Sequence, residues 1–96
     1  MNKKKVGIVT ETEKFEIQKL YERKLALNEM IPTLNSLSDE QKNELYEKII
    51  QDLGKTENNF QLWWYEKGVK YNWESSENGN WVIDFNNGEI FLVMHA

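Results

Sequence analysis

The side chains that could do chemistry in this sequence are one histidine and 16 acidic residues. His95 stands alone, without the second group that general-base or zinc chemistry requires. The absence of cysteine excludes a thiol nucleophile, a thiolate metal site and a disulfide framework. Acids that meet in a cleft could still do acid–base work, so an enzyme stays open, but we favour a protein that is not an enzyme and uses no cofactor or metal. Four acids stand where first helical turns are expected and the helix dipole favours negative charge: Glu11, Glu13, Asp39 and Glu40.

Two short motifs resemble ligand-binding loops but lack required residues. Gly54-Lys55-Thr56 matches the end of a phosphate-binding loop, yet position 49 is Ile where that loop needs Gly. A calcium loop that began at Asp84 would need Asp or Asn at position 88, Gly at 89 and Glu at 95. The sequence has Gly88, Glu89 and His95 at these positions. We interpret the first motif as a helix end followed by a helix start, and the second as a hairpin turn.

The segment FQLWWYEKGVKYNW, residues 60–73, holds half of all the Phe, Trp and Tyr in the chain. Large rings bury much area, so we expect two or three of them in the core. Apolar residues point to two sides of the expected helix, and a side that nothing covers would be a contact surface for a partner. The candidate binding residues are Leu62, Trp63, Trp64, Tyr65, Tyr71 and Trp73.

The spacing of apolar residues predicts three helices after a short β-like run at 5–9. Thr10 and Glu13 form a capping box before the first helix, and Pro32 ends it. Ser38 caps a second helix, which we expect Gly54 to end in left-handed geometry. The third, aromatic helix begins at Thr56.

The last 16 residues hold the clearest strand signal. Asn87-Gly88 between alternating segments predicts a two-residue hairpin turn, which pairs Phe85 with Ile90. The run 69–73 alternates as a strand does and predicts a third strand. The expected fold is therefore α+β, with an N-terminal helical hairpin and a third aromatic-rich helix packed on a small C-terminal antiparallel sheet of two or three strands. We expect one domain, 1–96, helical over about 10–67 and β over about 69–95.

Charge and hydropathy narrow the classes of partner. The net charge is −4, and Lys3–Lys5 supply a quarter of the basic residues, so the remainder is more acidic still. An acidic body repels phosphate backbones, which argues against nucleic acid as a partner. The longest apolar run, 90–94, is too short to cross a membrane, and no apolar signal segment is present, so we expect a cytoplasmic protein without a membrane partner.

Three stretches together resemble the small accessory proteins of CXXX-repeat peptide modification systems. They are KKVGIVTETEKFEIQKLYERKLAL, LYEKIIQDLGKTENNFQLWWYEKGVKYNW and WVIDFNNGEIFLV. The resemblance implies a bacterial pathway in which a radical-SAM-type maturase modifies a precursor peptide with repeated Cys-x-x-x units. It implies an accessory role, in which the chain binds the precursor peptide, the maturase or both, and it defines no catalytic residues. The shared positions include Glu22, Arg23, Lys24, Trp63, Trp64, Lys70, Tyr71 and Trp73.

Alternatives to this accessory role remain at the level of sequence. A small acidic regulator or inhibitor that binds another protein would concentrate its carboxylates on one face. An enzyme would need acids that converge in a cleft. A monomer and a homodimer are equally compatible with the sequence.

Overall fold

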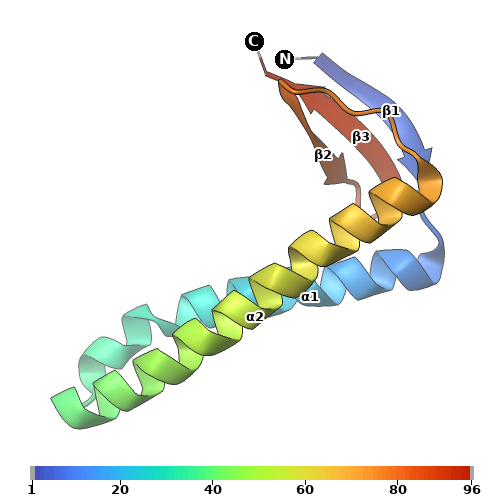
Figure 1. The fold of residues 1–96 in the computed structure, drawn as a ribbon. Coiled ribbons are helices and arrows are strands. Elements are labelled where there is room, and N and C mark those ends of the chain that lie inside the picture. Colours follow the sequence, from blue (N-terminus) through green and yellow to red (C-terminus); the bar gives the residue numbers. More distant parts are fainter. Residues whose placement is uncertain (1, 96) are drawn as a thin grey trace.

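The computed structural model describes residues 2–95, and it confirms the α+β class. Two helices lie side by side as a long arm, and a three-stranded antiparallel sheet stands at one end of this arm (Figure 1). The result is an L-shaped molecule with extents of 49 × 32 × 22 Å. No helix within residues 2–95 is long and apolar enough to cross a membrane.

The first helix, α1 (Glu11–Met30), begins and ends where its sequence signals predict. The Thr10 hydroxyl accepts a hydrogen bond from the Glu13 amide at 3.1 Å, and the Glu13 carboxylate accepts one from the Thr10 amide at 3.0 Å. This is the predicted capping box. At the other end Pro32 opens a short 3₁₀ helix, η1 (Pro32–Ser36), which turns the chain back.

The second helix, α2 (Asp39–Tyr71), is one continuous helix and corrects the prediction of two. Ser38 caps its start as predicted, but Gly54 lies inside the helix instead of ending it. A glycine in a helix costs only about 1 kcal/mol relative to alanine. Packing against α1 outweighs that cost, because Ile49, Thr56 and Trp63 are all buried on one side of α2, two turns apart. The helix ends at Asn72, whose φ of 51° is left-handed.

The sheet corrects a second prediction. Residues 69–71 belong to α2, so the run 69–73 is not a strand; the third strand is the N-terminal β1 (Asn2–Ile8). The strand order is β1-β3-β2, with β3 (Glu89–Met94) between β1 and β2 (Gly79–Ile83), and both pairs are antiparallel (Figure 1). The apolar strand β3 takes the central position, where neighbours cover it on both edges.

The predicted hairpin forms, but its register is shifted by two residues. Ile83 pairs with Ile90, so residues 84–88 form the turn, instead of the two-residue Asn87-Gly88 turn that would pair Phe85 with Ile90. Asp84 causes the difference: its carboxylate accepts from the Asn86 amide and its carbonyl from the Gly88 amide, each at 2.8 Å. Since the shift is an even number of residues, the same side chains still face the core.

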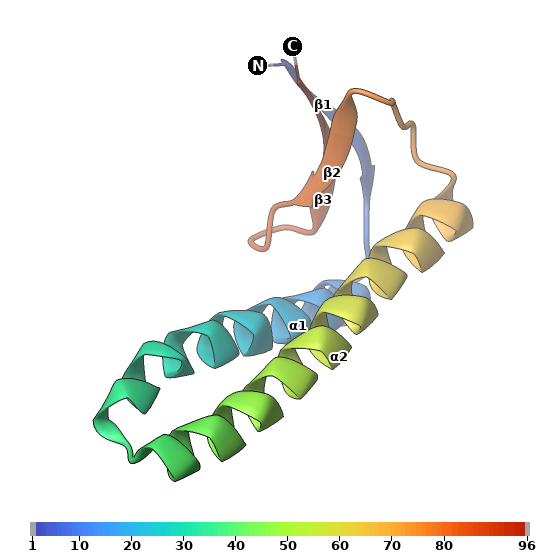
Figure 2. The same cartoon turned by 60° about the vertical axis from the view of Figure 1, so that its left-hand side comes forward.

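Two clusters of buried side chains hold the molecule together. The larger lies where the sheet meets the helices and contains Val9, Ile17, Trp63, Trp73 and Ile90. The smaller lies in the distal arm and contains only Leu27, Leu34 and Ile49. The sheet end therefore has a core with two layers, whereas the distal arm is a single layer of two helices (Figure 2).

Candidate functional site

The structure divides the six candidate residues of the aromatic segment between core and surface. Trp63 and Trp73 are buried, each with 6% of its surface exposed. Leu62 and Tyr65 are exposed, at 50% and 70%. The remaining two, Trp64 and Tyr71, are partly buried. Because α2 presents its rings to both α1 and the sheet, no single surface gathers all six.

The tryptophan rings form a contiguous cluster under the sheet. Trp63 meets Trp64 edge to face with centroids 4.9 Å apart, and Trp73 meets Trp81 in the same way at 5.3 Å. Tyr71 stacks on Trp73 with an interplanar angle of 9°. Such pairs contribute about 0.5–1.5 kcal/mol each beyond the area they bury. The cluster therefore fixes the sheet on the helices.

Two glycines permit this close packing. A Cβ at Gly7 of β1 would lie 2.7 Å from Cδ1 of Trp73, and a Cβ at Gly68 of α2 would lie 2.6 Å from Cη2 of Trp81. Both distances are too short for real atoms, so glycine is required at each position. The rings lie directly on the backbones of the strand and the helix.

An open groove lies beside this cluster, in the corner between α2 and β2. Its volume is about 460 Å³, which falls within the range of small-ligand sites. The partly buried ring of Trp64 and the exposed ring of Tyr65 contribute to it from the helix. The complete lining is Phe60, Gln61, Trp64, Tyr65, Ser75, Gly79, Asn80, Trp81 and Leu92.

The strand beside the groove, β2, has one free edge. The Asp84 amide donates a hydrogen bond to the Glu89 carbonyl, and the His95 amide donates one to the Asn78 carbonyl. Within residues 78–84, the even-numbered residues therefore form the backbone bonds toward β3. By the alternation of an antiparallel ladder, the N–H and C=O groups of Trp81 and Ile83 point outward, away from β3. This edge lies on the side of the sheet toward the distal arm (Figure 1).

The two edges of the sheet differ in their protection against further pairing. The β1 edge carries Lys3, Lys4 and Lys5 and has an irregular register between Lys5 and Gly7. Charged side chains and bulges are the usual means of blocking an edge. The β2 edge, GNWVI, has no charged residue and an unbroken register. It is the edge that can accept another strand.

Glu13 has a second role that sequence analysis missed. Its buried carboxylate, besides closing the capping box, accepts hydrogen bonds from the Tyr71 hydroxyl at 2.5 Å and the Lys70 ammonium at 2.8 Å. Lys67 lies 3.6 Å away. Residues 57 positions apart meet here, and no local pattern could have indicated it. The contacts fasten the start of α1 to the end of α2.

Electrostatics around Glu13 favour its charged form. Burial raises the pKa of Glu13, but hydrogen bonds from Lys70, Tyr71 and Thr10 outweigh it and lower the pKa from 4.5 to about 2. The same carboxylate raises the pKa of Lys70 and of the Tyr71 hydroxyl. A carboxylate that stays charged and a phenol that stays protonated fit an anchoring role rather than proton transfer.

Ion pairs also join the two helices along the arm. Arg23 donates to Asp52 from Nε at 3.2 Å and lowers the pKa of that carboxyl, and Lys24 lies 2.8 Å from Glu57 and lowers its pKa. Elsewhere, His95 contacts the Asn80 side chain. No group of three or more His, Cys, Asp or Glu residues within 2–95 is arranged to hold a metal ion.

Comparisons with models of known protein families, with curated proteins and with solved structures find no match for this chain.

Proposed function

We propose that this protein is a non-catalytic binding protein that receives an extended peptide on the free edge of β2. The observation that carries the proposal is an uncharged, unpaired strand edge directly beside an aromatic groove. The peptide adds as a fourth strand, and its main chain bonds to the outward groups of Trp81 and Ile83. Because these bonds use only the backbone, they give affinity with little dependence on peptide sequence.

The groove supplies selectivity for the peptide side chains. Alternate residues of an added strand point toward the helices, where they meet the rings of Trp64, Tyr65 and Trp81. Gln61 and Asn80 add amide groups that can hydrogen-bond a polar side chain. A medium-sized or aromatic side chain at every second position of the peptide fits this arrangement.

We further propose that the peptide comes from a ribosomal-peptide modification system, as the resemblance of the three stretches implies. A precursor with repeated Cys-x-x-x units is repetitive and extended, and strand addition suits such a chain because backbone bonds repeat along it. The protein then holds the precursor while a radical-SAM-type maturase acts on it.

A titration of the ¹⁵N-labelled protein tests this function. The probe is a synthetic peptide of Cys-x-x-x repeats with blocked thiols. Its control is the same peptide N-methylated at alternate residues, which cannot complete a strand ladder. We expect amide shifts at Trp81 and Ile83 and an indole shift at Trp64 with the first peptide only. Equal binding of both peptides, or shifts confined to β1, would contradict strand addition.

Two substitutions at position 83 show whether the peptide uses the β2 edge. Ile83→Pro removes an outward N–H without breaking a bond to β3, so the fold persists and peptide binding is lost. Ile83→Ala removes more of the side chain and keeps the N–H, so it serves as the packing control and retains binding. If Ile83→Pro binds as well as Ile83→Ala, the peptide does not use this edge.

A further inference from the structure

A second surface lies on the sheet-facing side of the distal arm, beyond the reach of the sheet. Gly68 lies under the ring of Trp81, which marks the sheet-facing side of α2. Tyr46 and Ile50 precede Trp64 and Gly68 by about 18 residues, which is five helical turns, so they lie on that same side. Their side chains are 47% and 43% exposed.

The first helix adds an apolar residue to the same side. Lys14 lies close to the β2–β3 turn at Gly88, and Tyr21 packs on Phe85 of that turn with centroids 5.3 Å apart. Leu25 follows Lys14 by about 11 residues, or three turns, and therefore also faces the sheet side. It is 44% exposed. We call Leu25, Tyr46, Ile50 and Gly54 the arm face.

Gly54 is the observation that points to a close partner. It follows Ile50 by one turn, and a Cβ built on it would have nothing within 4 Å. Gly7 and Gly68 are required by rings that lie on them, whereas no contact within the described chain requires glycine at 54. Glycine weakens a helix interior, but it lets a second backbone approach closely, as small residues do at helix–helix contacts.

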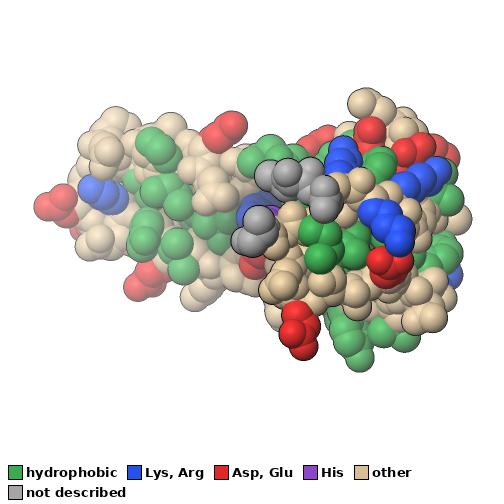
Figure 3. All heavy atoms as spheres, turned by 90° about the horizontal axis from the view of Figure 1, so that it is seen from above, with side chains coloured by type: hydrophobic (Ala, Val, Ile, Leu, Met, Phe, Trp, Pro, Cys, Tyr) green, Lys and Arg blue, Asp and Glu red, His purple; other side chains and the backbone are tan. Residues whose placement is uncertain are grey.

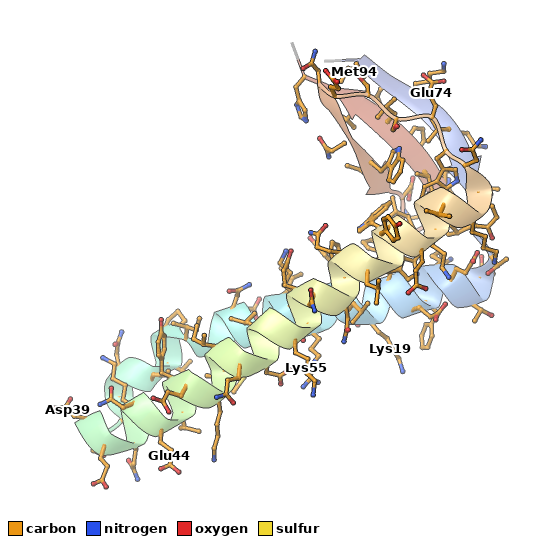
Figure 4. All side chains as sticks on the ribbon, in the orientation of Figure 1. Lys19, Asp39, Glu44, Lys55, Glu74 and Met94 are labelled. Carbon is orange, nitrogen blue, oxygen red and sulfur yellow. The ribbon has the colours of Figure 1, made fainter. Side chains whose placement is uncertain are left out.

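The charges around the arm face indicate the chemistry of that partner. Glu22 and Glu29 flank Leu25 on α1, and Glu47 precedes Ile50 by one turn on α2. None of the three forms an ion pair among residues 2–95. Apolar side chains on the arm are bordered mainly by acidic ones, with a basic side chain near the distal tip (Figure 3). The lysines at positions 19 and 55 point away from the sheet (Figure 4).

We propose that the arm face binds a basic amphipathic helix of a partner protein. The helix lies along α1 and α2 as the third helix of a bundle, with its backbone close to Gly54 and its apolar side chains on Leu25, Tyr46 and Ile50. Its lysines or arginines meet the flanking glutamates. This surface is separate from the β2 edge, so the protein can hold an extended peptide and a helical partner together.

A second copy of the chain fits this surface less well. A two-fold dimer places the same patch on both sides of the interface. The unpaired glutamates would then meet another acidic border, and like charges across an interface cost affinity. Lys42, one turn before Tyr46, supplies only one compensating cation on this part of α2.

Binding of two designed peptides tests the proposal. The probe is a helical peptide of about 18 residues, five turns, with leucine on one face and lysine on the other; its control replaces lysine by glutamate. We expect the lysine peptide to bind at least tenfold more tightly, with an affinity that falls as salt rises. Equal affinity of the two peptides, or no binding of the lysine peptide, overturns the proposal.

Variants locate the site. Ile50→Ser and Gly54→Leu should each weaken binding of the lysine peptide about tenfold, while Val69→Ser, at a residue 66% exposed on another side of α2, leaves it unchanged. Circular dichroism confirms that each variant keeps its helices. Unchanged affinity in both arm-face variants, or a stable dimer in sedimentation that Ile50→Ser dissociates, overturns the proposal. The Ile83→Pro variant should bind this peptide normally, which separates a failure here from a failure at the β2 edge.

Discussion

The two ends of α2 repeat one another in position and differ in what covers them. At the sheet end, Trp64 and Gly68 lie beneath β2, and Trp81 packs directly on the glycine. Five turns earlier, Tyr46 and Ile50 occupy the same side of the helix and remain exposed. The same helical periodicity thus produces core at one end and surface at the other, according to whether a second layer is present.

The two halves of the molecule therefore have different roles. The sheet end has a second layer, a ring cluster and the Glu13 anchor, so it supplies most of the stability. The distal arm buries only three apolar residues and leaves others free for contact. Substitutions at the sheet end should therefore cost folding free energy, and substitutions on the arm face should change binding.

The largest expected effect is at Trp63. Trp63→Ala leaves a large cavity in the main core and should lower the free energy of unfolding by roughly 3–5 kcal/mol. Tyr46→Ala, at an aromatic residue of the exposed arm face, should change it by no more than about 0.5 kcal/mol. Urea denaturation measures both. Similar losses in the two variants would mean that the arm face is covered within the folded chain.

The next largest effect is the contribution of the Glu13 carboxylate to folding stability, which depends on pH. Its folded pKa of about 2 lies below the ordinary 4.5, so its contribution, about 3 kcal/mol, is complete above pH 4.5. This stability is lost as the pH falls through 2. Glu13→Gln should lower the free energy of unfolding near neutral pH by this order and flatten its decline in acid.

Glu11→Gln is the matched control for Glu13, because its side chain is 84% exposed in the same helical turn. It should leave both the stability and its pH dependence nearly unchanged. If the acid transition of Glu13→Gln matches that of the unsubstituted protein, the buried carboxylate does not anchor the two helices.

The smallest effects have opposite signs at two glycines of one helix. Gly68→Ala forces a Cβ against Trp81, 2.6 Å away, and should destabilise by about 1–3 kcal/mol. Gly54→Ala meets open space and should stabilise by about 0.5–1 kcal/mol. Thermal unfolding distinguishes the two directions. A destabilising Gly54→Ala would show that glycine there serves the fold rather than a partner.

Local sequence signals predicted the element ends that depend on adjacent residues. The Thr10–Glu13 capping box and the Ser38 cap both occur, and a hairpin forms after Trp81 with a longer turn than predicted. The prediction that Gly54 ends a helix was wrong. A glycine that ends a helix and a glycine inside a helix look alike in the sequence, because the sequence does not show what the helix packs against. The prediction of a strand at 69–73 was wrong because α2 keeps its contacts with α1 up to Tyr71, whose hydroxyl donates a hydrogen bond to Glu13.

The candidate site was predictable only in part. Sequence analysis selected the aromatic segment as a candidate, and the two-sided pattern of this segment corresponds to buried Trp63 and exposed Tyr65. It could not predict the groove, because tertiary packing alone places Trp64 of α2 and Trp81 of β2 along the same groove. Nor could it rank the two sheet edges, since that ranking depends on β1 taking the outer position beside β3. Strand order is a long-range property.

Hydrogen exchange of the edge amides reports directly on strand addition at β2. The amides of Trp81 and Ile83 point away from β3, so they should exchange faster than that of Val82 in the free protein. Saturating Cys-x-x-x repeat peptide should slow both, while the amides of Lys3–Lys5 keep their rates. If the peptide leaves Trp81 and Ile83 unprotected, or protects the lysine-bearing edge instead, the proposed mode of binding is wrong.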